Sequence, residues 1–153
     1  MLLEFQIKSD NFFPLPADDL FSALTAKSRR ALERLKITKR FEKGASFYSA
    51  GDAPRRVYVM REGAGQILLE SVSKDILFKR LIVPNEIFGL TETIVGEPYE
   101  MRAETITPCV CECIARADFV RYLRDEPQIC FRLAEMLAAN LQKNRRLFFS
   151  SIK

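Results

Sequence analysis

The sequence predicts a mainly β domain, an antiparallel sandwich or barrel with short helices before it and a long helix after it. Between residues 37 and 113, short alternating apolar runs recur at near-regular spacing, separated by Gly, Asn, Asp and Pro. This pattern is typical of antiparallel sheets. Apolar residues at helical spacing precede this region, and a long helical repeat follows it from Pro127. The 153 residues are enough for one compact domain with a sizeable core.

The N-terminal part is expected to be a lead-in followed by two short helices. Residues 1–16 contain two prolines and no clear periodicity. Helices are expected over Asp18–Leu24 and Ala26–Leu35, where apolar residues share a face. One of the two aspartates at the start of the first helix can cap it, and Thr25 can cap the second, because these side chains accept hydrogen bonds from free N–H groups.

From Ile37 the apolar period changes from helical to alternating, and turn residues separate the runs. Ser73, Lys74 and Asp75 are expected to form a hairpin turn. The expected strands lie around Phe41 and Phe47–Tyr48, and over Val57–Met60, Gln66–Val72, Ile76–Val83, Ile87–Phe88, Met101–Thr107 and 109–113.

The segment between Gly89 and Gly96 is expected to be a short helix, Leu90–Val95, flanked by glycines that permit positive φ. Thr91 is placed to cap its first N–H groups. A short helix whose N-terminus points into a concavity can hold an anion. This segment is therefore the first candidate for a binding site.

The composition excludes several function classes. No histidine occurs, which removes His-based acid–base catalysis, His-ligated haem and His-carboxylate metal sites. No nucleophile–base pair or acidic cluster is evident, so an enzyme on a cupin-like barrel is the weakest alternative, and no catalytic or metal-ligating residue is assigned. The net charge of +4 is spread along the chain, which is poor support for nucleic-acid binding by itself.

No apolar run reaches transmembrane length, and the N-terminus lacks a signal-peptide pattern. A cytoplasmic location without a membrane partner is expected. Cys109, Cys111 and Cys113 alternate on one expected strand, where side chains two apart are poorly placed for a disulfide. We expect reduced thiols that pack as small apolar residues, and a thiol sensor or soft-metal site is the alternative.

Several motifs follow one another in a fixed order along the chain. They are Phe47-Tyr48-Ser49-Ala50-Gly51-Asp52, Val57-Tyr58-Val59-Met60, Gly63, Gly65-Gln66-Ile67, Pro84-Asn85-Glu86-Ile87-Phe88-Gly89, Gly96-Glu97-Pro98-Tyr99, Ala103-Glu104-Thr105 and Arg116-Ala117-Asp118-Phe119. Together they resemble the cyclic-nucleotide-binding-domain superfamily, and most closely the effector domains of Crp/Fnr transcription regulators. The resemblance implies a jelly-roll (double-stranded β-helix) barrel and a long helix through which two subunits dimerise. In complete regulators a helix-turn-helix DNA-binding domain comes next.

The resemblance also implies where a ligand would bind. Members that bind cyclic AMP carry a Gly-Glu pair for the ribose hydroxyl and an Arg-Ser/Thr pair for the phosphate. This chain keeps Gly89 but has Leu90 in place of the Glu, and the shorter loop reads Glu97-Pro98-Tyr99 where the Arg belongs. Cyclic AMP is therefore not the expected effector, and no cofactor is identified. The candidate pocket residues are Gly89, Leu90, Thr91, Glu97, Tyr99, Arg80, Asn140 and Asn144.

Three basic residues are candidates for a replacement cation. Arg102 is interpreted as a strand residue. Either Lys79 or Arg80 could point inward and bind an acidic effector, but the solvent face is favoured for both, because Lys and Arg are seldom buried unpaired.

The C-terminal helix is expected to run from Pro127 to about Phe149. Spacings of four and three define a seam typical of a coiled coil, and the residues expected at a homodimer interface are Leu133, Leu137, Asn140, Asn144 and Leu147. This apolar stripe is widened toward the barrel by Cys130, Ala134, Leu141 and Phe148. The alternative is a helix that covers only its own domain.

The sequence thus predicts a lead-in (1–16), a barrel domain (17–125) and a dimerisation helix (126–153). We expect a homodimeric regulatory domain that senses an unknown small molecule and contacts DNA only through a missing or separate DNA-binding domain. The alternative is a stand-alone dimerisation module whose pocket is filled by side chains such as Leu90 and Tyr99.

Overall fold

The computed structural model describes residues 14–151, apart from the side chains of Phe148 and Ser151. Most of the predicted lead-in lies outside the described residues. The N-terminal elements are β1 (Leu15–Pro16), α1 (Ala17–Phe21) and α2 (Ala26–Leu35). The strands that follow are β2 (Ile37–Phe41), β3 (Ser46–Tyr48), β4 (Arg56–Glu62), β5 (Gly65–Glu70), β6 (Ile76–Ile82) and β7 (Glu86–Phe88). The remaining elements are α3 (Leu90–Val95), β8 (Arg102–Thr105), β9 (Cys109–Ala115), α4 (Arg116–Asp125) and α5 (Pro127–Ser151).

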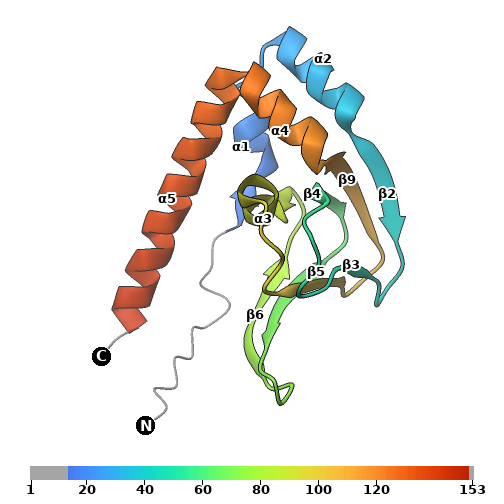
Figure 1. Cartoon of the computed structure of the whole chain (residues 1–153), viewed down its shortest axis with the longest axis vertical. Coiled ribbons are helices and arrows are strands. Elements are labelled where there is room, and N and C mark those ends of the chain that lie inside the picture. Colours follow the sequence, from blue (N-terminus) through green and yellow to red (C-terminus); the bar gives the residue numbers. More distant parts are fainter. Residues whose placement is uncertain (1–13, 152–153) are drawn as a thin grey trace.

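The strands form two antiparallel sheets, ordered β1-β7-β4-β9-β2 and β3-β8-β5-β6. Figure 1 shows α5 running along one side of the sheets, with α2 and α4 at one end. The prediction of a mainly antiparallel β domain with a C-terminal helix is confirmed.

Strand β4 contributes to two cores, because its four central residues are all buried. Tyr58 and Met60 pack inside the barrel with residues from both sheets. Val57 and Val59 point the other way, into a core shared with the helices α1, α2, α4 and α5. Successive residues of a strand point to opposite faces, so this strand is the wall between the barrel interior and the helical layer.

The barrel-facing side of β9 carries the three alternating cysteines, all buried and unbridged. Burial raises the pKa of all three thiols, that of Cys111 to about 12. The Sγ atom of Cys111 lies 3.8 Å from Sδ of Met60. The expectation that these thiols pack as small apolar residues is confirmed by their position.

The short helices begin with different caps. Thr25 caps α2 as predicted, since its hydroxyl oxygen accepts a hydrogen bond from the Ser28 amide at 3.1 Å. Helix α1 starts one residue early and ends at Phe21, and neither aspartate caps it. Its first free amides instead bind Asn85, whose backbone and side-chain oxygens accept from the Ala17 and Asp18 amides at 2.7 and 3.1 Å.

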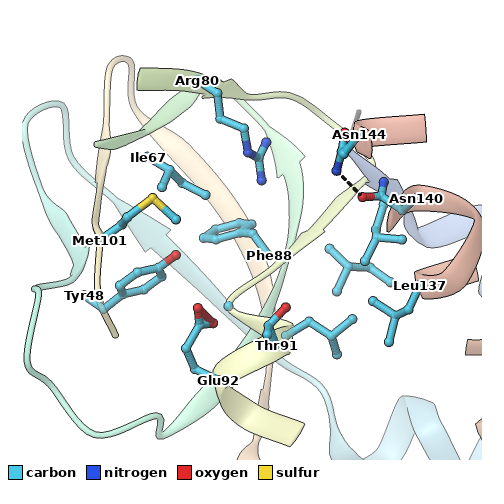
Figure 2. A pocket seen from close by; sticks show the side chains of 14 residues that line it. Tyr48, Ile67, Arg80, Phe88, Thr91, Glu92, Met101, Leu137, Asn140 and Asn144 are labelled. Atoms are coloured by element: carbon cyan, nitrogen blue, oxygen red, sulfur yellow. Dashed lines mark hydrogen bonds between the residues drawn. The ribbon is translucent and has the colours of Figure 1, made fainter. Parts of the chain in front are cut away.

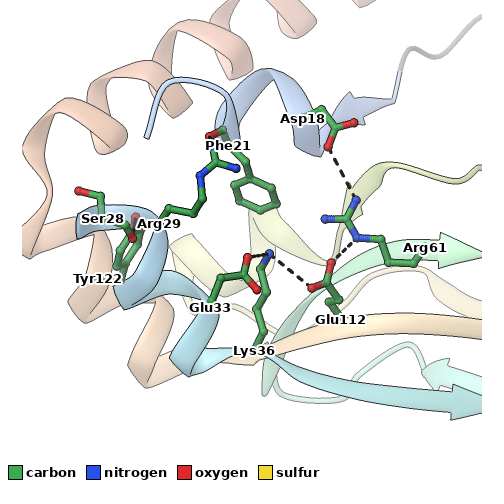
Figure 3. A network of polar contacts seen from close by, with 9 residues as sticks. All are labelled: Asp18, Phe21, Ser28, Arg29, Glu33, Lys36, Arg61, Glu112 and Tyr122. Atoms are coloured by element: carbon green, nitrogen blue, oxygen red, sulfur yellow. Dashed lines mark hydrogen bonds and ion pairs between the residues drawn. The ribbon is translucent and has the colours of Figure 1, made fainter. Parts of the chain in front are cut away.

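A chain of charged side chains ties α1 and α2 to the barrel (Figure 3). The Lys36 ammonium lies 2.7 Å from Glu33 and 3.4 Å from Glu112, and Arg61 pairs with both Glu112 and Asp18. The side chain of Lys36 is only 7% exposed. Such a partly buried network holds the helical layer in place more firmly than isolated surface pairs do.

Helix α5 is fixed to its own domain by its first three turns. Ile129, Leu133 and Met136 are buried in the helix-side core, and no described side chain beyond Met136 is fully buried. Leu137 packs against the same core. Two residues of the predicted dimer seam, Leu133 and Leu137, thus contact their own domain, and the seam itself stays a prediction. The stripe expected to face the barrel is instead exposed at Cys130, Ala134 and Leu141.

Within residues 14–151 no helix is both long enough and apolar enough to span a membrane.

Candidate functional site

A pocket of about 190 Å³ lies between the barrel, α3 and the middle of α5 (Figure 2). It is lined by the strands β1, β3, β5, β6 and β7, by the helices α3 and α5, and by the segment before β8. The lining residues are Leu15, Tyr48, Ile67, Arg80, Ile87, Phe88, Gly89, Leu90, Thr91, Glu92, Met101, Leu137, Asn140 and Asn144. Six of the eight predicted pocket residues are in this set.

Arg80 supplies the cation of the pocket. Its guanidinium lies 2.6 Å from Oε2 of Glu86, and the two side chains are 17% and 0% exposed. Burial raises the pKa of the Glu86 carboxyl, and the Arg80 guanidinium acts in the opposite direction. The expected solvent-facing position is wrong for Arg80, because the buried carboxylate of Glu86 compensates its charge. Lys79, one residue away, is exposed as expected.

The start of α3 forms one wall. Gly89 has a φ of 71°, and a Cβ there would lie 3.2 Å from both Tyr58 Cδ2 and Tyr99 Oη, so glycine is needed for both its φ and its size. Thr91 is exposed and does not cap the helix, because the capping position belongs to Gly89, which has no side chain. Leu90 is 3% exposed and packs in the helix-side core as well as lining the pocket.

Helix α5 forms another wall through Leu137, Asn140 and Asn144. The Asn144 side-chain N–H₂ donates to Oδ1 of Asn140 at 2.9 Å. Oδ1 of Asn144 is buried and has no hydrogen-bond partner among the described residues. A ligand with a suitably placed donor would satisfy this acceptor, which would otherwise cost free energy.

Glu97 and Tyr99 lie outside this pocket. Glu97 is exposed, and Tyr99 lines a second, larger hollow of about 470 Å³. Tyr99 stacks on Tyr48, with ring centroids 3.6 Å apart and planes 13° apart. The stacked pair separates the two hollows, since Tyr48 lines both.

Eight lining residues are not among the pocket residues predicted from the sequence, and three of these carry a polar or sulfur atom: Tyr48, Glu92 and Met101. Burial raises the pKa of the Tyr48 hydroxyl, and the nearby Glu92 carboxylate raises it further. Tyr48 and Phe47 are both buried in a three-residue strand with an irregular register. The alternation of apolar and polar residues therefore could not predict which of the two side chains faces the pocket. Glu92 lies one helical turn after Gly89, so its position on the same side of α3 could have been predicted from the sequence.

Arg102 lies on β8 and pairs with Glu70 at 2.6 Å and Glu104 at 2.5 Å. Its interpretation as a strand residue is confirmed. No group of three or more His, Cys, Asp or Glu side chains in the described part of the chain could hold a metal ion.

Residues 38–126 match the cyclic nucleotide-binding domain family. The fold is similar to that of the N-terminal domain of a transcriptional regulator from Streptomyces coelicolor A3(2), with a TM-score of 0.69 and 21% identity over 84% of this chain and 92% of that one. It is also similar to the sensor domain of the transcriptional regulator DNR from Pseudomonas aeruginosa, with a TM-score of 0.72, 17% identity, and coverage of 84% and 86%.

The catabolite activator protein of Thermus thermophilus is a third neighbour, with a TM-score of 0.71 and 19% identity. The match covers 82% of this chain but only 59% of that protein. A search of curated protein sequences found no match.

Proposed function

The chain belongs to the cyclic nucleotide-binding domain family, and from this premise we propose that it is the ligand-sensing domain of a Crp/Fnr-type transcription regulator. The observation that carries the proposal is the position of the pocket. Its walls include α3 and the middle of α5, so a ligand there contacts the barrel and the long helix at once.

The proposed mechanism is a shift between two positions of α5. A ligand that binds one position more tightly raises the population of that position. Asn140 and Asn144 lie just beyond the part of α5 that is buried against the domain. Ligand contacts at these two residues therefore act on the less constrained part of the helix. The proposed target of the signal is a DNA-binding output carried by a separate domain.

The effector is proposed to be a small molecule other than a cyclic nucleotide. Leu90 offers no acceptor for a ribose hydroxyl, and the loop at Glu97 offers no cation for a phosphate. A cavity of about 190 Å³ is also small, since pockets for drug-sized ligands span about 300–1,000 Å³. Losing one charge-assisted hydrogen bond costs about 1.5–3 kcal/mol. Losing two weakens a micromolar site by about two orders of magnitude or more.

We propose a homodimer that uses a different face of α5 from the predicted seam. Phe131, Ala134, Ala138 and Leu141 follow spacings of three and four and are all exposed, which is the pattern of a coiled-coil contact. Phe131 is 67% exposed and Leu141 is 52% exposed. We further propose that the barrel has the jelly-roll connectivity of the superfamily.

The dimer proposal is tested by light scattering at micromolar concentration. We expect twice the monomer mass for the wild type and the monomer mass for Leu141→Glu, because a buried unpaired charge at the contact is strongly unfavourable. Gln142→Glu is the matched control, since it adds the same charge one position along, and should leave the dimer intact. A monomeric wild type would contradict the proposal.

Ligand sensing is tested on protein purified without additions. Native mass spectrometry should detect a bound small molecule, and its removal should change hydrogen exchange in α5 beyond Met136. Titration calorimetry with cyclic AMP should show no binding below about the millimolar range. Micromolar cyclic AMP binding would refute the choice of effector class.

The second candidate is a stand-alone dimerisation module with a filled pocket. The burial of Leu90 and the stacked pair Tyr48–Tyr99 favour it, because these side chains occupy space that a larger ligand would need. Absence of any co-purified molecule, with exchange in α5 unchanged by treatment that strips ligands, would favour this module over the sensor.

A further inference from the structure

The pocket has opposite charges at its two ends. Figure 2 shows the Arg80 guanidinium entering the pocket from one side, while Glu92 and Thr91 lie on the other side. Between them lie apolar side chains, including Ile67, Phe88 and Met101. Such a pocket is complementary to a molecule with an acidic end, an apolar body and a donor at the far end.

The Arg80 end is suited to a carboxylate. A guanidinium presents five N–H donors in a planar fork that matches carboxylate geometry. One terminal nitrogen of Arg80 pairs with Glu86, and the other donates to the Leu81 carbonyl at 3.0 Å. The remaining N–H donors of Arg80 can still bind the single charge of a ligand carboxylate. The Glu86 carboxylate beside Arg80 repels any anion that binds there. A doubly charged phosphate monoester there would face stronger repulsion.

The Glu92 end is suited to a hydrogen-bond donor. An ionised carboxylate only accepts hydrogen bonds, whereas the hydroxyls of Tyr48 and Thr91 can donate or accept. Glu92 is close enough to Tyr48 to raise the pKa of its hydroxyl, so both groups act on the same part of the pocket. A hydroxyl or ammonium group of a ligand would find a charged acceptor here.

The volume limits the body between the two ends. An apolar cavity of about 150 Å³ holds one benzene molecule, and this pocket has about 190 Å³. We propose that the pocket takes a compact one-ring organic acid whose far end carries a hydroxyl or ammonium group. This inference rests on the proposed role of the pocket as the ligand site of the sensor.

Titration calorimetry with four probes tests the inference. The probes are 4-hydroxybenzoate, 4-(aminomethyl)benzoate, benzoate, which lacks the donor, and 4-hydroxybenzamide, which lacks the charge. We expect the first two to bind at least about tenfold more tightly than either truncated compound, since each truncation removes a charge-assisted hydrogen bond.

Single substitutions test which residue binds each end of the ligand. Arg80→Gln should abolish the preference for the acid over the amide, and Glu92→Gln should abolish the preference for 4-hydroxybenzoate over benzoate. Glu86→Gln should tighten binding of both acids severalfold, because it removes a competing negative charge. Lys79→Gln and Glu100→Gln are the controls. Each removes the same kind of charge from an exposed residue that does not line the pocket, so neither preference should change. If Arg80→Gln does not fold, the double variant Arg80→Gln/Glu86→Gln, which leaves no buried unpaired charge, replaces it.

Three results would overturn the inference: no binding of either bifunctional acid, equal binding of the acid and its amide, or an acid preference that survives the loss of Arg80. The proposed sensor function is judged separately. A co-purified molecule of another class that changes exchange in α5 would leave that function standing while this inference fails.

Discussion

Replacing Arg80 with Met tests how the buried ion pair contributes to stability. The Glu86 carboxylate is 0% exposed, and Arg80 provides its compensating charge at 2.6 Å. Removing one partner of a buried pair costs about 3–5 kcal/mol, because it leaves an uncompensated buried charge. Total stabilities of single domains are about 5–15 kcal/mol, so the loss should be large but measurable.

The loss should depend on pH in a direction set by Glu86. Its pKa is raised in the folded state by burial, and Arg80 lowers it. A raised folded pKa means that the contribution of Glu86 to stability is fully present below its unfolded pKa and is lost as pH rises through the folded pKa. Removing Arg80 raises the folded pKa further. The destabilisation at pH 8 should therefore exceed that at pH 5 by about 1.4 kcal/mol for each additional pKa unit.

Urea unfolding followed by circular dichroism at pH 5 and pH 8 measures both values, with a constant m-value confirming that the transitions are comparable. Arg102→Met is the matched control, because its ion pairs lie at the surface and should contribute about 1 kcal/mol or less. The double variant Arg80→Met/Glu86→Gln should recover most of the loss. A loss in Arg80→Met that matches the control, or that is equal at both pH values, would refute the reasoning.

Three further predictions concern thiols, a helix end and a cap. Under native conditions a thiol reagent should modify exposed Cys130 quickly, whereas fast native labelling of any buried thiol would support a sensor role for the strand cysteines Cys109, Cys111 and Cys113. Gly96→Ala should cost about 1–2 kcal/mol for its positive φ. The loss should exceed that of Gly44→Ala, because a Cβ at Gly96 would lie 2.8 Å from the Arg116 guanidinium, which donates a hydrogen bond to the Thr93 carbonyl and would have to move. Equal losses in urea melts would contradict this. Thr25→Ala should cost about 1 kcal/mol through loss of the α2 cap, and an unchanged urea midpoint would contradict it.

The parts of the fold that local chemistry determines were predictable. Helix α3 has the predicted bounds, Leu90–Val95, because glycines with positive φ end it on both sides. Thr25 identified the start of α2, and the alternation of cysteines identified the inward face of β9. Each of these signals is complete within a few residues of sequence.

The misses depended on partners distant in the sequence. Lys79 and Arg80 differ by one position, so which one faces inward depends on the register of β6 with β5. The start of α1 depends on Asn85, some seventy residues away along the chain. The face that α5 turns to its own domain depends on how the helix meets α1 and α4. The apolar face of α5 is broad, so its sequence did not determine which part of that face contacts the domain.

The fully buried side chains of α5 among the described residues all lie in its first three turns, so a tilt of the helix about these turns moves its far end most. From Leu137 to Ser151 it extends about 21 Å, at about 1.5 Å per residue. A tilt of about 5° at the buried turns would move its end by about 2 Å, on this rise per residue. Asn140 and Asn144 lie near the buried turns of α5. A small displacement of the helix at these two residues therefore produces a larger displacement at its C-terminal end. Under the proposed sensing mechanism, a small change in the pocket would therefore produce a larger displacement at the end of α5 while the buried contacts of Ile129 and Leu133 stay in place.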